Sequence, residues 1–67
     1  MNIYSFAENL CRICKERHIT VEELSERIDK SPRQVNRYRN GQCIDISLGT
    51  IIKIADVLGV KAEELLE

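Results

Sequence analysis

The chain has 67 residues, of which 43% are apolar and 31% charged, a composition that suits one folded globular domain and excludes a disordered segment. No apolar run exceeds two residues, which excludes a membrane span, and residues 1–4 lack the basic and apolar stretches of a secretory signal. We therefore expect a cytoplasmic protein whose three cysteines are free thiols and form no disulfide framework.

The net charge is only −1, but the charges are unevenly distributed. Residues 27–42 contain five basic residues and a single acidic one, Asp29, whereas the rest of the chain contains five basic and ten acidic residues. A basic segment within an acidic chain indicates that this segment contacts a negatively charged partner.

Helix signals follow one another along the chain, and strand-like alternation is absent. Three segments fit the capping box, in which a hydroxyl accepts a backbone N–H bond: Ser5-x-x-Glu8, Thr20-x-x-Glu23 and Ser31-x-x-Gln34. Gly41 and Gly59 are suited to end helices in the left-handed conformation. Together with apolar periodicity, these signals predict helices at about residues 6–17, 21–28, 32–40, 48–58 and 62–66. We expect a single all-α domain over residues 1–67, a compact five-helix bundle.

Apolar residues at helical spacing predict which side chains enter the core. In the first helix they are Phe6, Leu10 and Ile13, and in the second Val21, Leu24 and Ile28. In the fourth helix the expected core residues are Leu48, Ile51, Ile52, Ala55 and Leu58.

The helix expected at 32–40 has two chemically different faces. At about 100° per residue, Val35 and Tyr38 point toward the core. The opposite face carries no acid and holds Arg33, Asn36, Arg37 and Asn40, with Gln34 on its flank. Arginine pairs with guanine and asparagine or glutamine with adenine in the major groove of DNA. The two-residue link Asp29-Lys30 would hold this face outward, as a recognition helix requires.

Nearly the whole chain, from about Phe6 to Leu66, resembles the Cro/phage-repressor type of helix-turn-helix domain. The residues that carry the likeness are Ile19-Thr20-x-Glu22-Glu23-Leu24-Ser25, Ser31-x-x-x-Val35-x-Arg37-Tyr38, Gly41, Ile51-x-Lys53-Ile54-Ala55-x-x-Leu58-Gly59-Val60 and Glu64-Leu65-Leu66. The resemblance implies a lambda-repressor-like bundle whose second and third helices form the helix-turn-helix and dock on double-stranded DNA. It also implies a homodimer on a pseudo-palindromic operator. We expect a sequence-specific transcriptional regulator, of the repressor type or else an activator or an antitoxin-like autoregulator.

The resemblance assigns roles to particular side chains. Arg33, Gln34 and Arg37 match the base-reading positions of the family. The residues expected to contact the DNA backbone or to flank those contacts are Thr20, Lys30, Ser31, Asn36, Asn40 and Gln42.

The sequence departs from the family pattern at three informative places. Val21 replaces a glutamine that commonly contacts a phosphate, so that anchor is lost. Asp29 replaces the usual turn glycine, and aspartate tolerates the left-handed region better than most residues. Cys14 and Arg39 stand where the family often has a buried arginine–glutamate pair between the first and third helices.

Cys11, Cys14 and His18 have the spacing of one helix face and, with Cys43, offer four ligands that suit zinc or a redox sensor. In the other interpretation, Cys14 is a small core residue, Cys11 is partly exposed and His18 ends the helix. We expect no metal and no cofactor. We also expect no enzymatic activity, because the lone His18 has no nucleophile or orienting acid arranged around it.

The main alternative to a DNA-binding regulator is a protein-interaction module that keeps the fold but no longer binds DNA. Two observations suggest this alternative: the net acidity of the chain and the loss of the phosphate anchor at Val21. If the protein dimerises, the candidate contacts are the apolar residues Ile44, Ile46, Leu65 and Leu66.

Overall fold

The computed structural model describes residues 3–42 and 45–67. Within them lie five helices and no strand: α1 (Ile3–Glu16), α2 (Val21–Ile28), α3 (Pro32–Arg39), α4 (Leu48–Leu58) and α5 (Ala62–Leu66). The expected all-α, five-helix fold is confirmed. None of these helices has both the length and the apolar character needed to cross a bilayer.

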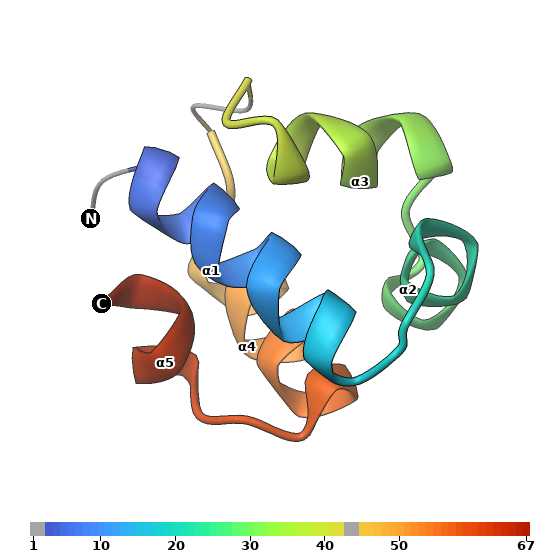
Figure 1. Cartoon of the computed structure of the whole chain (residues 1–67). Helices are drawn as coiled ribbons and strands as arrows, with labels where there is room; N and C mark the ends of the chain where they lie inside the picture. The colour runs from blue at the N-terminus through green and yellow to red at the C-terminus, as the bar shows by residue number, and fades with distance from the viewer. Residues whose placement is uncertain (1–2, 43–44) are drawn as a thin grey trace.

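The helices are arranged so that α3 lies along one edge of the molecule (Figure 1). α1 runs between α3 and α5 and packs against both of them. α2 packs against α3 and α4, and α4 packs against α5. One side of α3 therefore faces the rest of the bundle, and its other side faces outward.

The core takes side chains from all five helices. Among the residues described, its largest fully buried members are Phe6, Leu10, Leu24, Ile28, Val35, Ile54, Leu58 and Leu65. Val21 of α2, expected in the core, is only partly buried and packs against it. Burying each large aliphatic or aromatic side chain stabilises the fold by about 1.5–3 kcal/mol.

The expected core face of α4 is wrong at two positions. Leu48 and Ile52 are 63% and 53% exposed, and Ile54, which was not expected in the core, is completely buried. The buried stripe of α4 is Ile51, Ile54, Ala55 and Leu58. These residues follow the i, i+3, i+4, i+7 spacing of one helix face, whereas Leu48 and Ile52 form a neighbouring face one turn apart.

Hydroxyl side chains begin three of the helices. Thr20, Ser31 and Ser47 each accept a hydrogen bond from the backbone N–H three residues later, at 3.1 Å in every case. At Thr20 the box is complete, because Glu23 also reaches back to the Thr20 backbone N–H. The expected cap at Ser5 is wrong, since α1 already begins at Ile3. Serine is tolerated within a first turn, so the Ser5-x-x-Glu8 pattern does not stop the helix from starting earlier.

Four helices end in the same way, with one residue in the left-handed region. These residues are His18 (φ 55°), Asp29 (φ 58°), Gly41 (φ 70°) and Gly59 (φ 72°). After each of them, the next backbone N–H bonds back to a carbonyl five residues earlier, at 2.9–3.0 Å. This is the Schellman arrangement, which satisfies the last carbonyls of a helix and turns the chain sharply.

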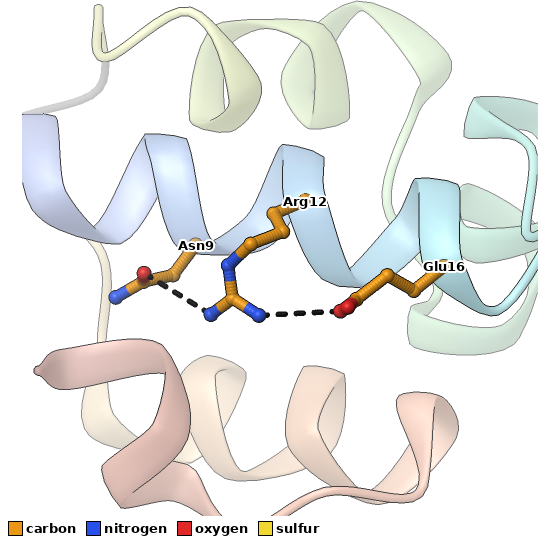
Figure 2. A network of polar contacts seen from close by, with 3 residues as sticks. All are labelled: Asn9, Arg12 and Glu16. Carbon is orange, nitrogen blue, oxygen red and sulfur yellow. Dashed lines mark hydrogen bonds and ion pairs between the residues drawn. The ribbon is translucent and has the colours of Figure 1, made fainter.

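A polar network joins α1 to the end of the chain. The Asn9 amide donates to the carbonyls of Leu65 and Glu67, at 3.0 and 2.9 Å. Figure 2 shows the guanidinium of Arg12 between the side-chain oxygen of Asn9 and the carboxylate of Glu16. It donates to Asn9 Oδ1 at 3.4 Å and to Glu16 Oε1 at 3.2 Å. Leu65 is completely buried beside this network, so the expectation that it is an exposed dimer contact is wrong.

Two alanine substitutions at glycines should change stability in opposite directions. A Cβ at Gly59 meets no atom closer than 3.6 Å. Gly59→Ala should therefore lower the free energy of unfolding by about 1 kcal/mol, only because an alanine disfavours the left-handed backbone at this position. Gly49 lies in the first turn of α4, where an added Cβ would meet only the Ser47 hydroxyl oxygen, in ordinary van der Waals contact at 3.9 Å. Gly49→Ala should therefore raise the free energy of unfolding by about 0.5–1 kcal/mol. Urea unfolding of both variants measures these changes, and shifts of the same sign would contradict this account of the helix ends.

The Asn9 network predicts unequal effects for its two members. Asn9→Ala removes both bonds to the chain end and should lower the free energy of unfolding by about 1–2 kcal/mol. Arg12→Ala removes only an exposed ion pair and one long hydrogen bond, and should lower it by less than about 0.5 kcal/mol. Thermal and urea unfolding measure both, and equal losses would show that Asn9 does not anchor α5.

Candidate nucleic-acid interface

Two buried side chains orient α3. Val35 is completely buried and Tyr38 is 3% exposed, and both belong to the core. Because α3 packs against α1 and α2 through this side, its opposite side faces solvent. The helix periodicity predicted this orientation correctly.

The exposed side of α3 carries polar and cationic groups. Arg33, Asn36, Arg37 and the C-cap residue Asn40 are all exposed, while Gln34 is partly buried and engaged in a contact. In the described part of the chain one ion pair is found, between Arg12 and Glu16 on α1. The guanidinium groups of Arg33 and Arg37 are therefore not neutralised by a carboxylate of that part, and both remain available to an anionic partner.

The turn between α2 and α3 sets the direction in which α3 leaves the bundle. Asp29 adopts the left-handed conformation (φ 58°, ψ 45°), and the Lys30 N–H bonds to the Ser25 carbonyl at 3.0 Å. The expectation that aspartate takes the place of a turn glycine here is confirmed. Ser31 then caps α3 directly, and Pro32 occupies the first turn, where its missing N–H is not needed. The chain thus passes from α2 to α3 through three residues.

The remaining predicted contact residues lie around this surface. Thr20, Lys30, Ser31 and Gln42 are all exposed. The Thr20 hydroxyl lies 3.1 Å from a Glu23 carboxylate oxygen, so a negative charge stands beside that expected phosphate contact. Lys30 forms no ion pair with a carboxylate of the described residues. Lys30 is therefore the better placed of the two for an anion.

A family model for the Cro/C1-type HTH DNA-binding domain matches residues 9–67. The chain belongs to this family. Searches of curated proteins and of solved structures found no match. In this Cro/C1-type domain α2 and α3 form the helix-turn-helix, and the domain binds DNA.

Sequence reasoning missed a basic edge beside the helix-turn-helix. An open pocket of about 370 Å³ lies next to the α2–α3 turn and is lined by Ile28, Asp29, Lys30, Ser47, Gly49, Thr50 and Lys53. It brings Lys53 of α4 to the same edge as Lys30, although the two are far apart in the sequence. The Ser47 cap was a signal for the start of α4, but the sequence pattern alone did not show that α4 begins beside the turn.

The arrangement of the described residues does not support the alternative of a cysteine-based metal or redox sensor. Cys14 is 3% exposed, and burial raises its pKa, an effect that nearby Arg39 opposes. His18 ends α1 in the left-handed conformation, as the packing interpretation expected. No three histidine, cysteine or acidic side chains gather to hold a metal within residues 3–42 and 45–67. Cys43 and Ile44 lie outside the described residues.

Asp29 is the one carboxylate among the described residues that line the basic edge, and its removal should tighten DNA binding. Asp29→Asn keeps a residue that tolerates the left-handed region. We expect affinity for duplex DNA to rise about two- to fivefold, whatever the sequence, because one repulsion of phosphate is lost. Fluorescence anisotropy at fixed salt measures this change. The control Glu63→Gln removes a charge from α5, which lies across α1 from α3, and should change affinity much less. Equal effects of the two variants would contradict this placement of the interface.

Proposed function

We propose that this domain reads base sequence in the major groove of duplex DNA with the outward side of α3 and thereby acts as a transcriptional repressor. The observation that supports the proposal most strongly is the orientation of α3. Val35 and Tyr38 are buried, whereas Arg33 and Arg37 are exposed and pair with no carboxylate of residues 3–42 and 45–67. A protein that binds a promoter by this surface blocks its use by occupying it, and no catalytic step is needed.

The side chains divide into two groups by the chemistry they offer. Arg33 and Arg37 suit the paired acceptors of guanine, and Gln34 suits adenine. The groups expected at phosphates are exposed and surround that face; they are Thr20, Lys30, Ser31, Asn36, Asn40 and Gln42. Lys53 joins them from α4 through the basic edge. Phosphate contacts position the protein, and base contacts give its specificity.

The proposal includes binding as a homodimer on a pseudo-palindromic operator. The eight residues of α3 span about 12 Å, so one copy contacts only a few base pairs. A two-fold pair of α3 helices would read two half-sites about one helical turn apart. Leu48 and Ile52 are the exposed large hydrophobic residues of the described chain and lie one turn apart on α4. We place the self-association contact there, and no longer at Leu65.

Substitution of the two arginines tests the proposed readout. Selection of genomic fragments should return a sequence motif, and gel shifts should show affinity falling as salt rises. Arg33→Ala and Arg37→Ala should each weaken binding to the selected site by about 1–3 kcal/mol and relax the preference at one base pair. Arg12→Ala, which removes an arginine held by Glu16 on α1, should leave both affinity and preference unchanged.

The contrary result is also clear. If no motif is selected at low salt, and both α3 variants bind DNA as weakly as the parent chain, base readout is excluded. A protein-interaction module on the same fold would then be the better description.

The dimer contact has its own test. The double variant Leu48→Gln/Ile52→Gln should weaken self-association by at least about tenfold, because a central apolar contact is lost. It should leave the folded monomer intact, since both side chains are exposed. Sedimentation equilibrium measures the association, and Leu66→Gln, at a partly buried position, is the control that should reduce stability and not dimerisation. Unchanged self-association in the double variant would exclude this face of α4.

A further inference from the structure

A second pocket lies between α1 and the last turn of α3. It has a volume of about 410 Å³ and is lined by Cys11, Arg12, Cys14, Lys15, Ile19 and Arg39. Small-molecule sites in proteins commonly have volumes of this order. The DNA-binding proposal uses none of these six residues, so the pocket has no role in it.

Arg39 brings a guanidinium group to this pocket. Its Nε atom is buried and has no hydrogen-bond partner among the described residues. Buried polar atoms are almost always paired, and a buried donor without an acceptor costs about 1–3 kcal/mol, more when the group is charged. On α1 the neutral thiol of Cys14 lies near Arg39, and no acidic residue lines the pocket. The Nε–H group of Arg39 therefore lacks an acceptor among the described residues.

The walls of the pocket favour an anion with an apolar part. Three of its six lining residues are basic, and none is acidic. The guanidinium of Arg12 is already held by Asn9 and Glu16 (Figure 2), which leaves Arg39 and the exposed Lys15 as the available cations.

The other walls are neutral. The Cys11 thiol donates to the Arg39 carbonyl at 3.4 Å, and the Cys14 thiol is kept protonated by burial, which raises its pKa. Ile19 completes an apolar and polarisable surface. The lining thus combines two cations with sulfur and hydrocarbon, and contains no carboxylate to repel an anion.

We propose that this pocket binds a small organic carboxylate, whose oxygens accept hydrogen bonds from Arg39 and Lys15 while its apolar part packs on Ile19 and the two cysteine sulfurs. A guanidinium matches the planar geometry of a carboxylate. Free phosphate fits less well, because the thiol and hydrocarbon walls offer few further donors for its oxygens. The ligand contacts both α1 and α3, so it binds the packed arrangement of these two helices. This binding does not depend on whether the domain binds DNA as proposed.

The test is an NMR titration of the uniformly ¹⁵N-labelled full chain with acetate, butyrate and benzoate at constant ionic strength. Benzoate should bind with a Kd of about 1–10 mM, and more tightly than butyrate and acetate, because its larger apolar part gains more contact. The Nε–Hε signal of Arg39 and the amides of Cys11, Cys14 and Ile19 should shift together and saturate. Benzamide and butyramide, which match the probes in shape but carry no charge, should cause no saturable shift at these signals.

Variants separate the two cations. Arg39→Gln should weaken benzoate binding by more than about tenfold, and Lys15→Gln by about two- to fivefold. Arg27→Gln removes an exposed arginine of α2 outside the pocket and should have no effect.

Three results would overturn the proposal. They are the absence of a saturable shift with any carboxylate, equal shifts with benzoate and benzamide, and a response to inorganic phosphate alone. The amide comparison uses the unaltered chain, so a folding defect in Arg39→Gln cannot hide the answer.

Discussion

Val35 and Tyr38 hold α3 against α1 and α2, and the exposure of Arg33 and Arg37 follows from that contact. Burial of two such side chains is worth several kcal/mol, which is a large part of the net stability of a chain this short. The side of the helix that faces outward is therefore fixed by core packing. The exposed side of α3, which we propose reads DNA, therefore needs no contact of its own to keep this orientation, and α3 contains no acidic residue.

The turn at Asp29 complements this packing. The lengths of α2 and α3, eight residues each, do not determine the angle between these helices. The left-handed backbone of Asp29, which lies between them, sets this angle. The same kind of ending recurs after α1, α3 and α4, so the bundle is built from short helices that stop abruptly and pack closely. Two of the four left-handed positions are held by His18 and Asp29 and not by glycine, at some conformational cost. Asp29 also brings a carboxylate to the edge of the surface that we propose binds DNA.

The features predictable from the sequence are those decided by neighbouring residues. The caps at Thr20 and Ser31, the turn at Asp29 and the buried pair Val35 and Tyr38 all depend on interactions within a few positions. The features that escaped prediction depend on distant contacts.

Leu48 and Ile52 are exposed because Ile54 and its neighbours already fill the side of α4 that faces the core. Two adjacent faces of α4 are apolar, and the sequence pattern alone does not show which of them is buried. Leu65 is buried because the Asn9 network holds the chain end against α1. The Nε of Arg39, which has no hydrogen-bond partner among the described residues, and the position of Lys53 in the same pocket as Lys30 are likewise properties of helix packing, so they were visible only in the structure.

The central claim is that one side of α3, positioned by the core, is the surface that meets DNA. The most direct measurement is an NMR map of the ¹⁵N-labelled domain bound to its selected operator, with intermolecular contacts assigned to individual side chains. The account predicts that the guanidinium signals of Arg33 and Arg37 show contacts to bases while the rings and methyl groups of Tyr38 and Val35 keep their contacts within the core. Base contacts arising from α4 or α5, with the α3 side chains unchanged from the free protein, would contradict it.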